Sequence, residues 1–449
     1  SYTVYFNLNN PEHEIAKITP DEIQIMKNGG NEDGIILDGS RKMKPLKFLP
    51  DADLEEADRL LVDLLVGNMT CPQGDRFLIL SWLSCFLLID FAGTRPMTRF
   101  EGSAGSGKTT ASKITSTLLY GEPQHKKATD AANYTDGSQN PLIVLDNIEV
   151  KQMTEDLTTF MLTSITGIAK EKRKSGTDSE TITERTKCLL NTTGIEPLCG
   201  ELSEILSRSF VINFDLANQA SDCFLESEVI SAIQQNRDLI ISAIMKRTSH
   251  VLAMIRDGAQ KQVMRLLHRT MPTHGKRRCN DYLSLMYLMM LAGSEEHEVT
   301  TGLEDLSPLF IEQIHSINDT SQEMARESNP IATALASLFH AYRNAVELDE
   351  KARYGEDDRA NHVVGFIERY QVRFENENTM EPVSAGRLLA ALRRVGREFN
   401  LEFEYKKPAQ LGRRISNDLD VIRDAGFDID RQRNAHTKNF EYRICHKSR

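Results

Sequence analysis

The chain has 449 residues and a formal net charge of −11, with 40% hydrophobic and 27% charged residues, the balance of a soluble globular protein of about three domains. The longest apolar stretch, residues 77–92, contains serines and Asp90, so it excludes a membrane span and predicts a buried helix. The seven cysteines, at positions 71, 85, 188, 199, 223, 279 and 445, lack Cys-x-x-Cys and Cys/His spacing, which argues against zinc and for a reducing, cytoplasmic location.

The first hundred residues divide into two predicted parts. Residues 1–50 form a β-rich N-terminal region, because short strands at 3–8, 22–26 and 34–37 alternate with Asn/Gly and Asp/Gly turns. Residues 51–95 form a helical collar, with an amphipathic helix over 51–68 and the buried helix over 77–91. Because no leader sequence follows Ser1, we expect the chain to be cut from a longer protein.

Residues 96–215 are predicted to form an α/β core that binds nucleotide. Residues 102–109 satisfy the pattern G-x-x-x-x-G-K-[ST] at every fixed position. A short strand precedes this loop and a helix follows it, so backbone N–H groups and the helix N-terminus would converge on phosphate oxygens. Lys108 would reach the β- and γ-phosphates of ATP, and the Thr109 hydroxyl would hold Mg²⁺. The full set of expected phosphate-binding residues is Gly102, Ser103, Ala104, Gly105, Ser106, Gly107, Lys108, Thr109 and Thr110.

A second strand of the core is predicted where the apolar run 142–145 ends in Asp146. A buried parallel strand would place this carboxylate at the carboxyl end of the sheet, where open α/β sheets bind ligands. Asp146 is then either a partner of Mg²⁺ or a turn residue at a strand end. The spacing from the phosphate-binding loop favours the magnesium role.

Two further polar residues follow in the order that a ring-forming ATPase requires. Asn191 ends another apolar strand, and its amide is expected to orient the attacking water at the γ-phosphate. Arg208 ends a short helix, just before the apolar strand 210–214. It is either an arginine finger for a neighbouring subunit's nucleotide or a partner in an intrachain ion pair.

A basic hairpin is predicted between the acid-ended strand and the Asn191 strand, because two polar segments flank the turn 175–178. Its cations are Lys170, Lys172, Arg173 and Lys174. In a ring, such hairpins would line a pore and follow the phosphates of a single strand. The alternative is a solvated basic hairpin with no ligand.

The rest of the chain is predicted to be helical and then mixed. Residues 216–330 form a helical lid over the nucleotide, in which Arg277 or Arg278 either contacts phosphate or lies in a solvated turn. The methionines and aromatics of the apolar helix 281–292 indicate packing rather than a cofactor site. Residues 331–380 form a helical linker with a charged stretch at 349–361.

Residues 381–449 are predicted to form a winged-helix domain: a helix capped by Ser384, a second helix over 408–425, and strands at 427–430 and 440–444. The segment 386–449 carries 15 Lys and Arg against 9 Asp and Glu, a basic module on an acidic chain. The residues expected to face nucleic acid are Arg413, Arg414 and Asn417 on the second helix and Arg431, Arg433 and Lys438 in the wing. The alternative use of this domain is protein contact.

These motifs together resemble the ATPase modules of phage-, plasmid- and island-encoded primase–helicase proteins, which are AAA+ machines close to superfamily-3 and MCM-like helicases. The resembling segments are 100–110, 144–147, 166–169, Arg173, 191–195 and 204–209, together with 4–8 and 43–46 in the N-terminal region. The resemblance implies that Lys108, Thr109 and Asp146 bind Mg-ATP, that Asn191 is sensor 1, and that Arg208 is the arginine finger. In many such proteins a primase-polymerase domain lies upstream.

One position departs from the family's pattern. Many AAA+ ATPases place a catalytic glutamate directly after the Asp146 position, where this chain has Asn147, which lacks a carboxylate to accept a proton. Either Glu149 serves as the base, or Asp146 acts with Asn147 orienting water, or hydrolysis is slow.

We therefore expect an α/β P-loop AAA+ core with a small β-rich N-terminal region, a helical lid and a C-terminal winged helix. The expected function is an ATP- and Mg²⁺-dependent DNA helicase or translocase that works as a homo-oligomer, a hexameric ring, on single-stranded or forked DNA and not at a membrane. The main alternative is an ATP-dependent switch or assembly protein on DNA that does not unwind it. A small-molecule kinase would leave Asn191, Arg208 and the winged helix without a role.

Overall fold

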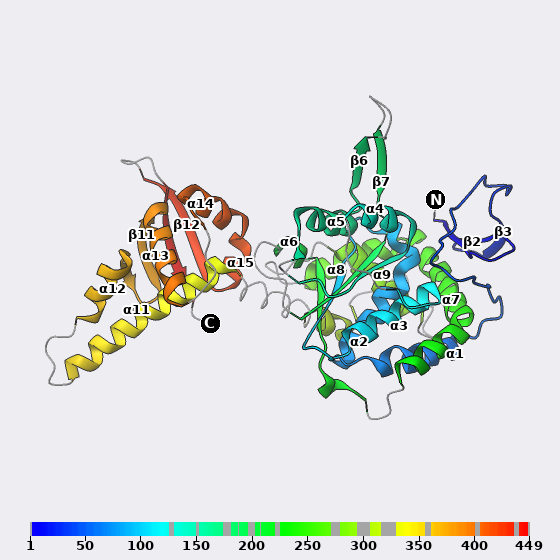
Figure 1. Ribbon diagram of the computed structural model, residues 1–449, viewed down its shortest axis with the longest axis horizontal. Coiled ribbons are helices and arrows are strands. Elements are labelled where there is room, and N and C mark those ends of the chain that lie inside the picture. The colour runs from blue at the N-terminus through cyan, green and yellow to red at the C-terminus, as the bar shows by residue number, and fades with distance from the viewer. Residues whose placement is uncertain are drawn as a thin grey trace. The chain divides into compact units, whose positions relative to one another are not determined.

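The computed structural model describes residues 2–124, 130–149, 152–173, 181–186, 188–195, 203–206, 208–220, 225–270, 279–293, 306–315, 329–354, 361–399, 405–434 and 440–447. The chain divides into two compact units (Figure 1). Unit 1 comprises residues 1–197 and 205–319, and unit 2 comprises residues 198–204 and 320–449.

The N-terminal region is a three-stranded antiparallel sheet in the order β1 (Val4–Asn7), β2 (Glu14–Ile18), β3 (Ile23–Lys27). β2 supplies its buried centre, since Ile15, Ala16 and Ile18 are fully buried. The prediction of a strand at 34–37 is wrong: this segment has no strand, and Ile36 is exposed. β2 was not predicted, because polar residues interrupt its apolar pattern.

A four-stranded parallel sheet forms the centre of unit 1, in the order β5 (Leu142–Leu145), β8 (Leu189–Gly194), β4 (Met97–Glu101), β9 (Ser209–Asn213). Every residue of β4, β5 and β8 is buried, as expected for strands covered on both faces. The sequence of β5 is a continuous apolar run, whereas β4 and β8 also bury polar residues. The carboxyl ends of all four strands meet at one edge of the sheet, which we call the carboxyl edge.

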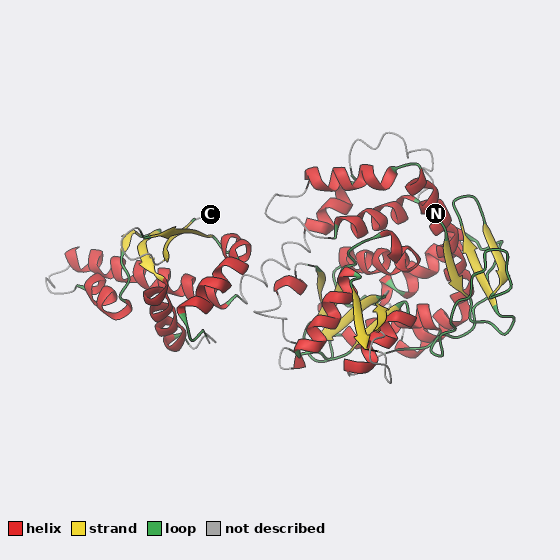
Figure 2. Cartoon of the chain, turned by 90° about the horizontal axis from the view of Figure 1, so that it is seen from above, coloured by secondary structure: helices red, strands yellow, loops and turns green. Residues whose placement is uncertain are grey.

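Helices lie around the parallel sheet (Figure 2). α3 (Lys108–Tyr120) follows β4 and packs against the 31-residue helix α7 (Glu226–Arg256), which also packs along α1 (Leu54–Leu64). The other helices of unit 1 are η1 (Val66–Asn68), α2 (Gln73–Ser84), η2 (Cys85–Phe91), α4 (Asp130–Gln139), α5 (Glu155–Thr166), α6 (Ser203–Leu206), which spans the unit boundary, η5 (Leu216–Asn218), α8 (Ala259–Thr270), α9 (Asn280–Leu291) and a helix over 308–315.

One hydrophobic core unites most of unit 1. It runs from Leu8 in the N-terminal region through Trp82 of α2 and Ile114 of α3 to Ile244 of α7 and Ile314. The prediction separated residues 51–95 and 216–330 into a collar and a lid. In the structure, residues of both segments, as far as Ile314, pack into this same core. Most of the stretch 77–92 is buried as predicted, although Asp90 is exposed. Among the described residues no helix is long and apolar enough to cross a membrane.

The predicted basic hairpin is present as β6 (Ala169–Arg173) and β7 (Thr181–Arg185), an antiparallel pair in which Arg173 lies opposite Thr181. It stands out from the body of unit 1, above α4 and α5 (Figure 1).

Unit 2 is a four-stranded antiparallel sheet covered by helices. The strand order is β10 (Phe374–Asn376), β11 (Thr379–Ser384), β13 (Phe440–His446), β12 (Phe427–Arg433). The helices are α11 (Pro330–Tyr354), α12 (His362–Tyr370), α13 (Ala385–Glu398), α14 (Pro408–Asn417) and α15 (Leu419–Asp424).

Two features of unit 2 differ from the prediction. Residues 331–380 are not a separate linker, because Leu335 of α11 and Phe366 of α12 share a core with Leu392 of α13 and Ile444 of β13. The single helix predicted over 408–425 is broken between α14 and α15 at Asp418. The Asp418 carboxylate accepts hydrogen bonds from Arg414 Nε and Asn329 Nδ2, at 2.7 and 2.8 Å, which fixes this break.

Candidate nucleotide-binding site

The loop between β4 and α3 contains three glycines whose backbone conformations disfavour residues with side chains. Gly102, Gly105 and Gly107 have φ angles of 144°, 80° and 97°, in the region that L-amino acids with side chains rarely adopt. A Cβ at Gly102 would lie 2.2 Å from the Phe214 carbonyl oxygen, and one at Gly107 would lie 2.4 Å from Thr70 Oγ1. The loop therefore presents bare backbone at the carboxyl edge, next to the N-terminus of α3.

Lys108 folds back over this loop. Its ammonium group donates hydrogen bonds to the Gly102 and Ser103 carbonyl oxygens, each at 2.7 Å. Burial lowers the pKa of Lys108, and the neighbouring carboxylates of Glu149 and Asp146 oppose that effect. The cation is held where an anion on the loop would meet it.

Two hydroxyl groups converge on one oxygen of Asp146, which follows β5. Thr109 Oγ1 and Thr193 Oγ1 donate to Asp146 Oδ1 at 3.1 and 2.7 Å, and the backbone N–H of Asn147 donates to Thr193 Oγ1 at 2.8 Å. Hydroxyl and carboxylate oxygens are the protein ligands that Mg²⁺ prefers. The predicted pair of Thr109 and Asp146 is thus brought together, and this donor set fits Mg²⁺.

Sequence reasoning missed Thr193, although the strand register explains it. Val144 of β5 pairs with Asn191 of β8, and Leu145 pairs with Thr192. The next step along both strands sets Asp146 beside Thr193, at the carboxyl edge. The signal was available as two threonines directly after the apolar run that ends in Asn191.

Asn191 lies two residues inside the sheet and is fully buried. Its Oδ1 accepts from Ser112 Oγ of α3 at 2.7 Å, and its Nδ2 donates to Thr98 Oγ1 of β4 at 2.8 Å. These two hydrogen bonds join α3 to the sheet through the amide that is predicted to orient water at a γ-phosphate. Thr193 lies two positions further along β8, at the carboxyl edge.

The turn after Asp146 holds the two candidates for a catalytic base. Asn147 is exposed, with a left-handed φ of 57°. Glu149 is partly buried, and its Oε1 accepts from the backbone N–H of Ile195 at 2.8 Å. The carboxylate nearest to Asp146 in sequence is therefore anchored to the segment that follows β8.

A buried ion pair lies on β4 beneath this turn, and sequence reasoning did not assign it. Arg99 Nε contacts Glu101 Oε1 at 3.1 Å, with both side chains buried. Arg99 Nη1 also donates to the carbonyl oxygens of Ile148 and Thr193, at 2.8 and 2.9 Å. Arg99 thus positions the two strand ends that carry Asp146 and Thr193.

Two residues outside the sheet brace the loop and α3. Thr70 Oγ1 donates to the Ser106 carbonyl oxygen. Glu226, at the start of α7, accepts from Thr110 Oγ1 and from Lys113 Nζ, the latter at 2.7 Å. The long helix α7 is thereby bonded to the first turns of the helix that carries Lys108.

Arg208 lies at the opposite edge of the sheet from the loop. Its carbonyl oxygen accepts from the backbone N–H of Met97, at the amino end of β4, at 3.1 Å. Because Glu101 and Gly102 are at the other end of that strand, Arg208 is remote from the loop of its own subunit. Its side chain is buried, with 8% of the residue exposed.

The predicted nucleic-acid contacts have different outcomes. Lys170, Lys172 and Arg173 lie on β6, whereas Lys174, Arg277, Arg278 and Lys438 lie outside the described residues. On α14, Arg413 is exposed, but Arg414 Nε is bonded to the buried Asp418 carboxylate. In β12, the Arg431 guanidinium stacks 3.6 Å from the centre of the Phe440 ring, and Arg433 is exposed. Of Asn417 only the backbone is described.

No family model and no curated protein sequence matches this chain. Solved structures do resemble it. The active helicase Cch of SCCmec type IV superposes with a TM-score of 0.52 at 12% identity, covering 98% of this chain and 78% of that one. The apo C-terminal region of NrS-1 has a TM-score of 0.39 at 13% identity, covering 98% and 95%. The likeness to Cch shows that the chain has a helicase-like fold with a mixed α/β core.

Proposed function

We propose that this chain is an ATP-driven motor on DNA, a helicase or translocase with an AAA+ core. The observation that carries the proposal is the convergence of Thr109 and Thr193 on Asp146, next to Lys108 and a glycine loop at the carboxyl edge. The sheet order supports it, because β8 separates the strand before the loop from the strand that ends at Asp146. The helicase-like fold is compatible with the same function.

The chain's own groups would divide the work on ATP as follows. The backbone N–H groups of 102–107 and the N-terminus of α3 would hold the phosphates, and Lys108 would exchange its two carbonyl partners for phosphate oxygens. Thr109 and Asp146 would hold Mg²⁺, which supplies charge neutralisation at the phosphates. Thr193 would orient Asp146 and the attacking water, and Glu149 would accept its proton.

Arg208 supports an oligomer, because it lies at the wrong edge of the sheet to serve its own loop. In a hexameric ring, the edge that carries Arg208 would face the carboxyl edge of the next subunit, and the guanidinium would turn outward to stabilise charge there. Subunits with Lys108→Ala and subunits with Arg208→Ala should each be inactive alone. A mixture should regain ATPase activity, because one subunit supplies the site and the other supplies the arginine. A mixture as inactive as its components would contradict the shared site.

Two parts of the chain would contact DNA. The β6–β7 hairpin carries Lys170, Lys172 and Arg173 away from the body of unit 1, as a phosphate track requires. In unit 2, β13 lies between β11 and β12 in the sheet, and α13 and α14 lie between β11 and β12 in the chain. This order supports the proposal that the unit works as a winged helix. α14 would be its recognition helix, with Arg413 exposed toward the groove.

Strand displacement is the direct test of the motor. With a forked duplex, ATP and Mg²⁺, the chain should release the displaced strand, and Lys108→Ala should not. Forks with single-stranded tails of either polarity should be supplied, so that travel in either direction is detected. ATP turnover without displacement on any fork would contradict the helicase proposal.

ATP turnover without strand displacement would favour a second candidate, an ATP-dependent switch that assembles on DNA without unwinding it. Asn147 supports this candidate, because the exposed side chain directly after Asp146 has no carboxylate to accept a proton. The switch predicts slow turnover, and an Asn147→Glu variant that hydrolyses ATP faster than the wild type.

A further inference from the structure

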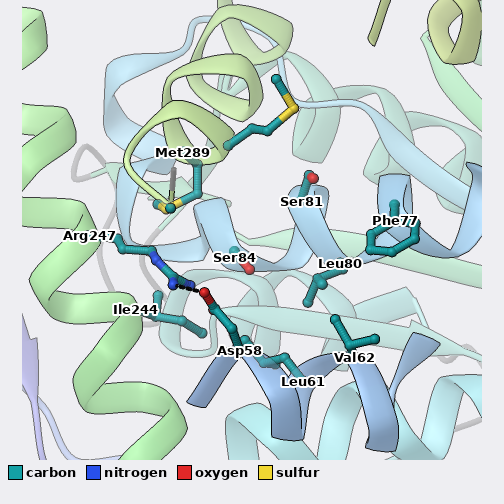
Figure 3. A pocket seen from close by; sticks show the side chains of 12 residues that line it. Asp58, Leu61, Val62, Phe77, Leu80, Ser81, Ser84, Ile244, Arg247 and Met289 are labelled. Atoms are coloured by element: carbon teal, nitrogen blue, oxygen red, sulfur yellow. Dashed lines mark hydrogen bonds and ion pairs between the residues drawn. The ribbon is translucent and has the colours of Figure 1, made fainter. Parts of the chain in front are cut away.

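A cavity of about 300 Å³ opens on the helical side of unit 1, among α1, α2, α7 and α9 (Figure 3). Its walls are mostly apolar and come from Leu61, Val62, Phe77, Leu80, Ile244 and Met289. Arg247 belongs to the same helix α7 as Glu226, but lies 21 residues further along, about 31 Å at 1.5 Å per residue. The cavity is therefore separate from the candidate nucleotide site.

One ion pair crosses this apolar cavity. Arg247 of α7 donates through Nη2 to Asp58 Oδ2 of α1, and Figure 3 shows the two side chains pointing toward one another. Arg247 is only 8% exposed, and its Nε has no hydrogen-bond partner in the part of the chain that the structure describes. A buried donor without an acceptor destabilises the fold. The guanidinium thus retains donor capacity that the fold itself does not use.

The charges of Arg247 and Asp58 indicate which kind of hydrogen-bond acceptor the Arg247 guanidinium would bind. Because Asp58 already compensates the Arg247 charge, a second carboxylate would bring an uncompensated negative charge into apolar surroundings. An uncharged carbonyl oxygen needs no such compensation. The hydroxyl groups of Ser81 and Ser84 also line the cavity and offer further neutral polar contacts.

The rim indicates what carries that carbonyl. Val62 and Met290 line the cavity and are each 39% exposed, so apolar surface continues from the cavity onto the face of unit 1. An apolar anchor in a pocket, surrounded by more apolar contact surface, is the arrangement by which proteins bind polypeptide segments. We propose that this cavity binds one large apolar side chain of a partner polypeptide, with the adjoining backbone carbonyl on the Arg247 guanidinium.

The test uses the full chain, with the methionine methyl groups ¹³C-labelled, and two blocked dipeptides. N-acetyl-Leu-Phe-amide should shift the Met289 and Met290 methyl resonances saturably, and N-acetyl-Gly-Gly-amide should not. A second pair of probes, N-acetyl-leucine and N-acetyl-leucine amide, tests the charge argument. N-acetyl-leucine carries a free carboxylate and should bind at least about five-fold more weakly than N-acetyl-leucine amide. Binding of the free acid alone would overturn the proposal, as would the absence of a saturable shift with every probe.

Two variants distinguish specific binding in this cavity from nonspecific apolar binding. In Gly293→Ala the new methyl group would lie 3.5 Å from Arg247 Nε and should weaken the leucine peptide at least about five-fold. The matched control Gly365→Ala adds a methyl group where nothing lies within 4 Å and should leave binding unchanged. Should Gly293→Ala not fold, Met290→Gln replaces it as the test variant, because Met290 is an exposed rim residue. Binding to this variant is measured from the Met289 methyl resonance. If Gly293→Ala and Met290→Gln both bound the leucine peptide with the affinity of the wild type, the proposal would be overturned.

Discussion

Polar side chains lie both at the carboxyl edge of the parallel sheet and in its interior. The two groups of side chains have different hydrogen-bond partners. At the edge, Lys108, Thr109, Asp146 and Thr193 surround bare loop backbone. In the interior, Asn191 bonds to Ser112 and Thr98. Only one residue of β8, Thr192, lies between Asn191 and Thr193. The comparison teaches that position along a strand, rather than residue type alone, decides whether a polar side chain lies at the carboxyl edge or bonds within the sheet interior.

The interior ion pair should show the largest effect on stability. Arg99→Met leaves Glu101 buried without its cation, which should cost about 3–5 kcal/mol. Arg99→Met/Glu101→Leu removes both charges and should cost less than the single change. The fluorescence of Trp82, the one tryptophan of the sequence, reports urea unfolding of unit 1. A single variant as stable as the wild type would show that the pair contributes nothing.

Two substitutions on β8 sharpen the comparison between edge and interior. Thr193→Val removes the hydroxyl that bonds to Asp146. ATP turnover should fall about ten-fold, which corresponds to about 1.4 kcal/mol in the activation barrier. Thr193→Ser keeps the hydroxyl and should retain most of the turnover. Asn191→Leu removes two interior hydrogen bonds and should cost about 1–3 kcal/mol of stability. If Asn191→Leu lost turnover while remaining fully folded and stable, the amide rather than Thr193 would be the working group.

Two neighbouring arginines of α14 show a similar contrast, because one is exposed and the other is hydrogen-bonded within the fold. Arg413 is exposed, so Arg413→Ala should weaken DNA binding and reduce the slope of log affinity against log salt by about 1. Arg414 is bonded to Asp418, so Arg414→Ala should instead speed hydrogen exchange in α14 and α15. A normal salt slope in Arg413→Ala would move the DNA contact away from this helix.

Local patterns in the sequence predicted much of the fold. The strand–loop–helix over 97–120, the strand that ends at Asp146, the basic hairpin and the two C-terminal strands are all present. Each has a short-range signal: a glycine motif, a continuous apolar run or an alternating pattern around a turn. The break between α14 and α15 has none, because the Asp418 carboxylate is held by Asn329, 89 residues earlier.

The candidate site was predictable only where a motif covered it. Lys108, Thr109 and Asp146 follow from spacing, whereas Thr193 and Arg99 depend on which strands are neighbours. Arg99 lies in the short strand that is predicted before the loop, and it contacts the backbone of Ile148 and Thr193, 49 and 94 residues away. Pairing over such separations is set by tertiary packing, which a single sequence does not show.

ATP turnover with and without single-stranded DNA, in the wild type and in Lys108→Ala, tests the central claim most directly. The account predicts that DNA stimulates the wild type and that Lys108→Ala, correctly folded by its Trp82 fluorescence, loses about 100-fold or more of that turnover. Turnover that survives in Lys108→Ala would show that the carboxyl edge of this sheet is not where ATP is hydrolysed.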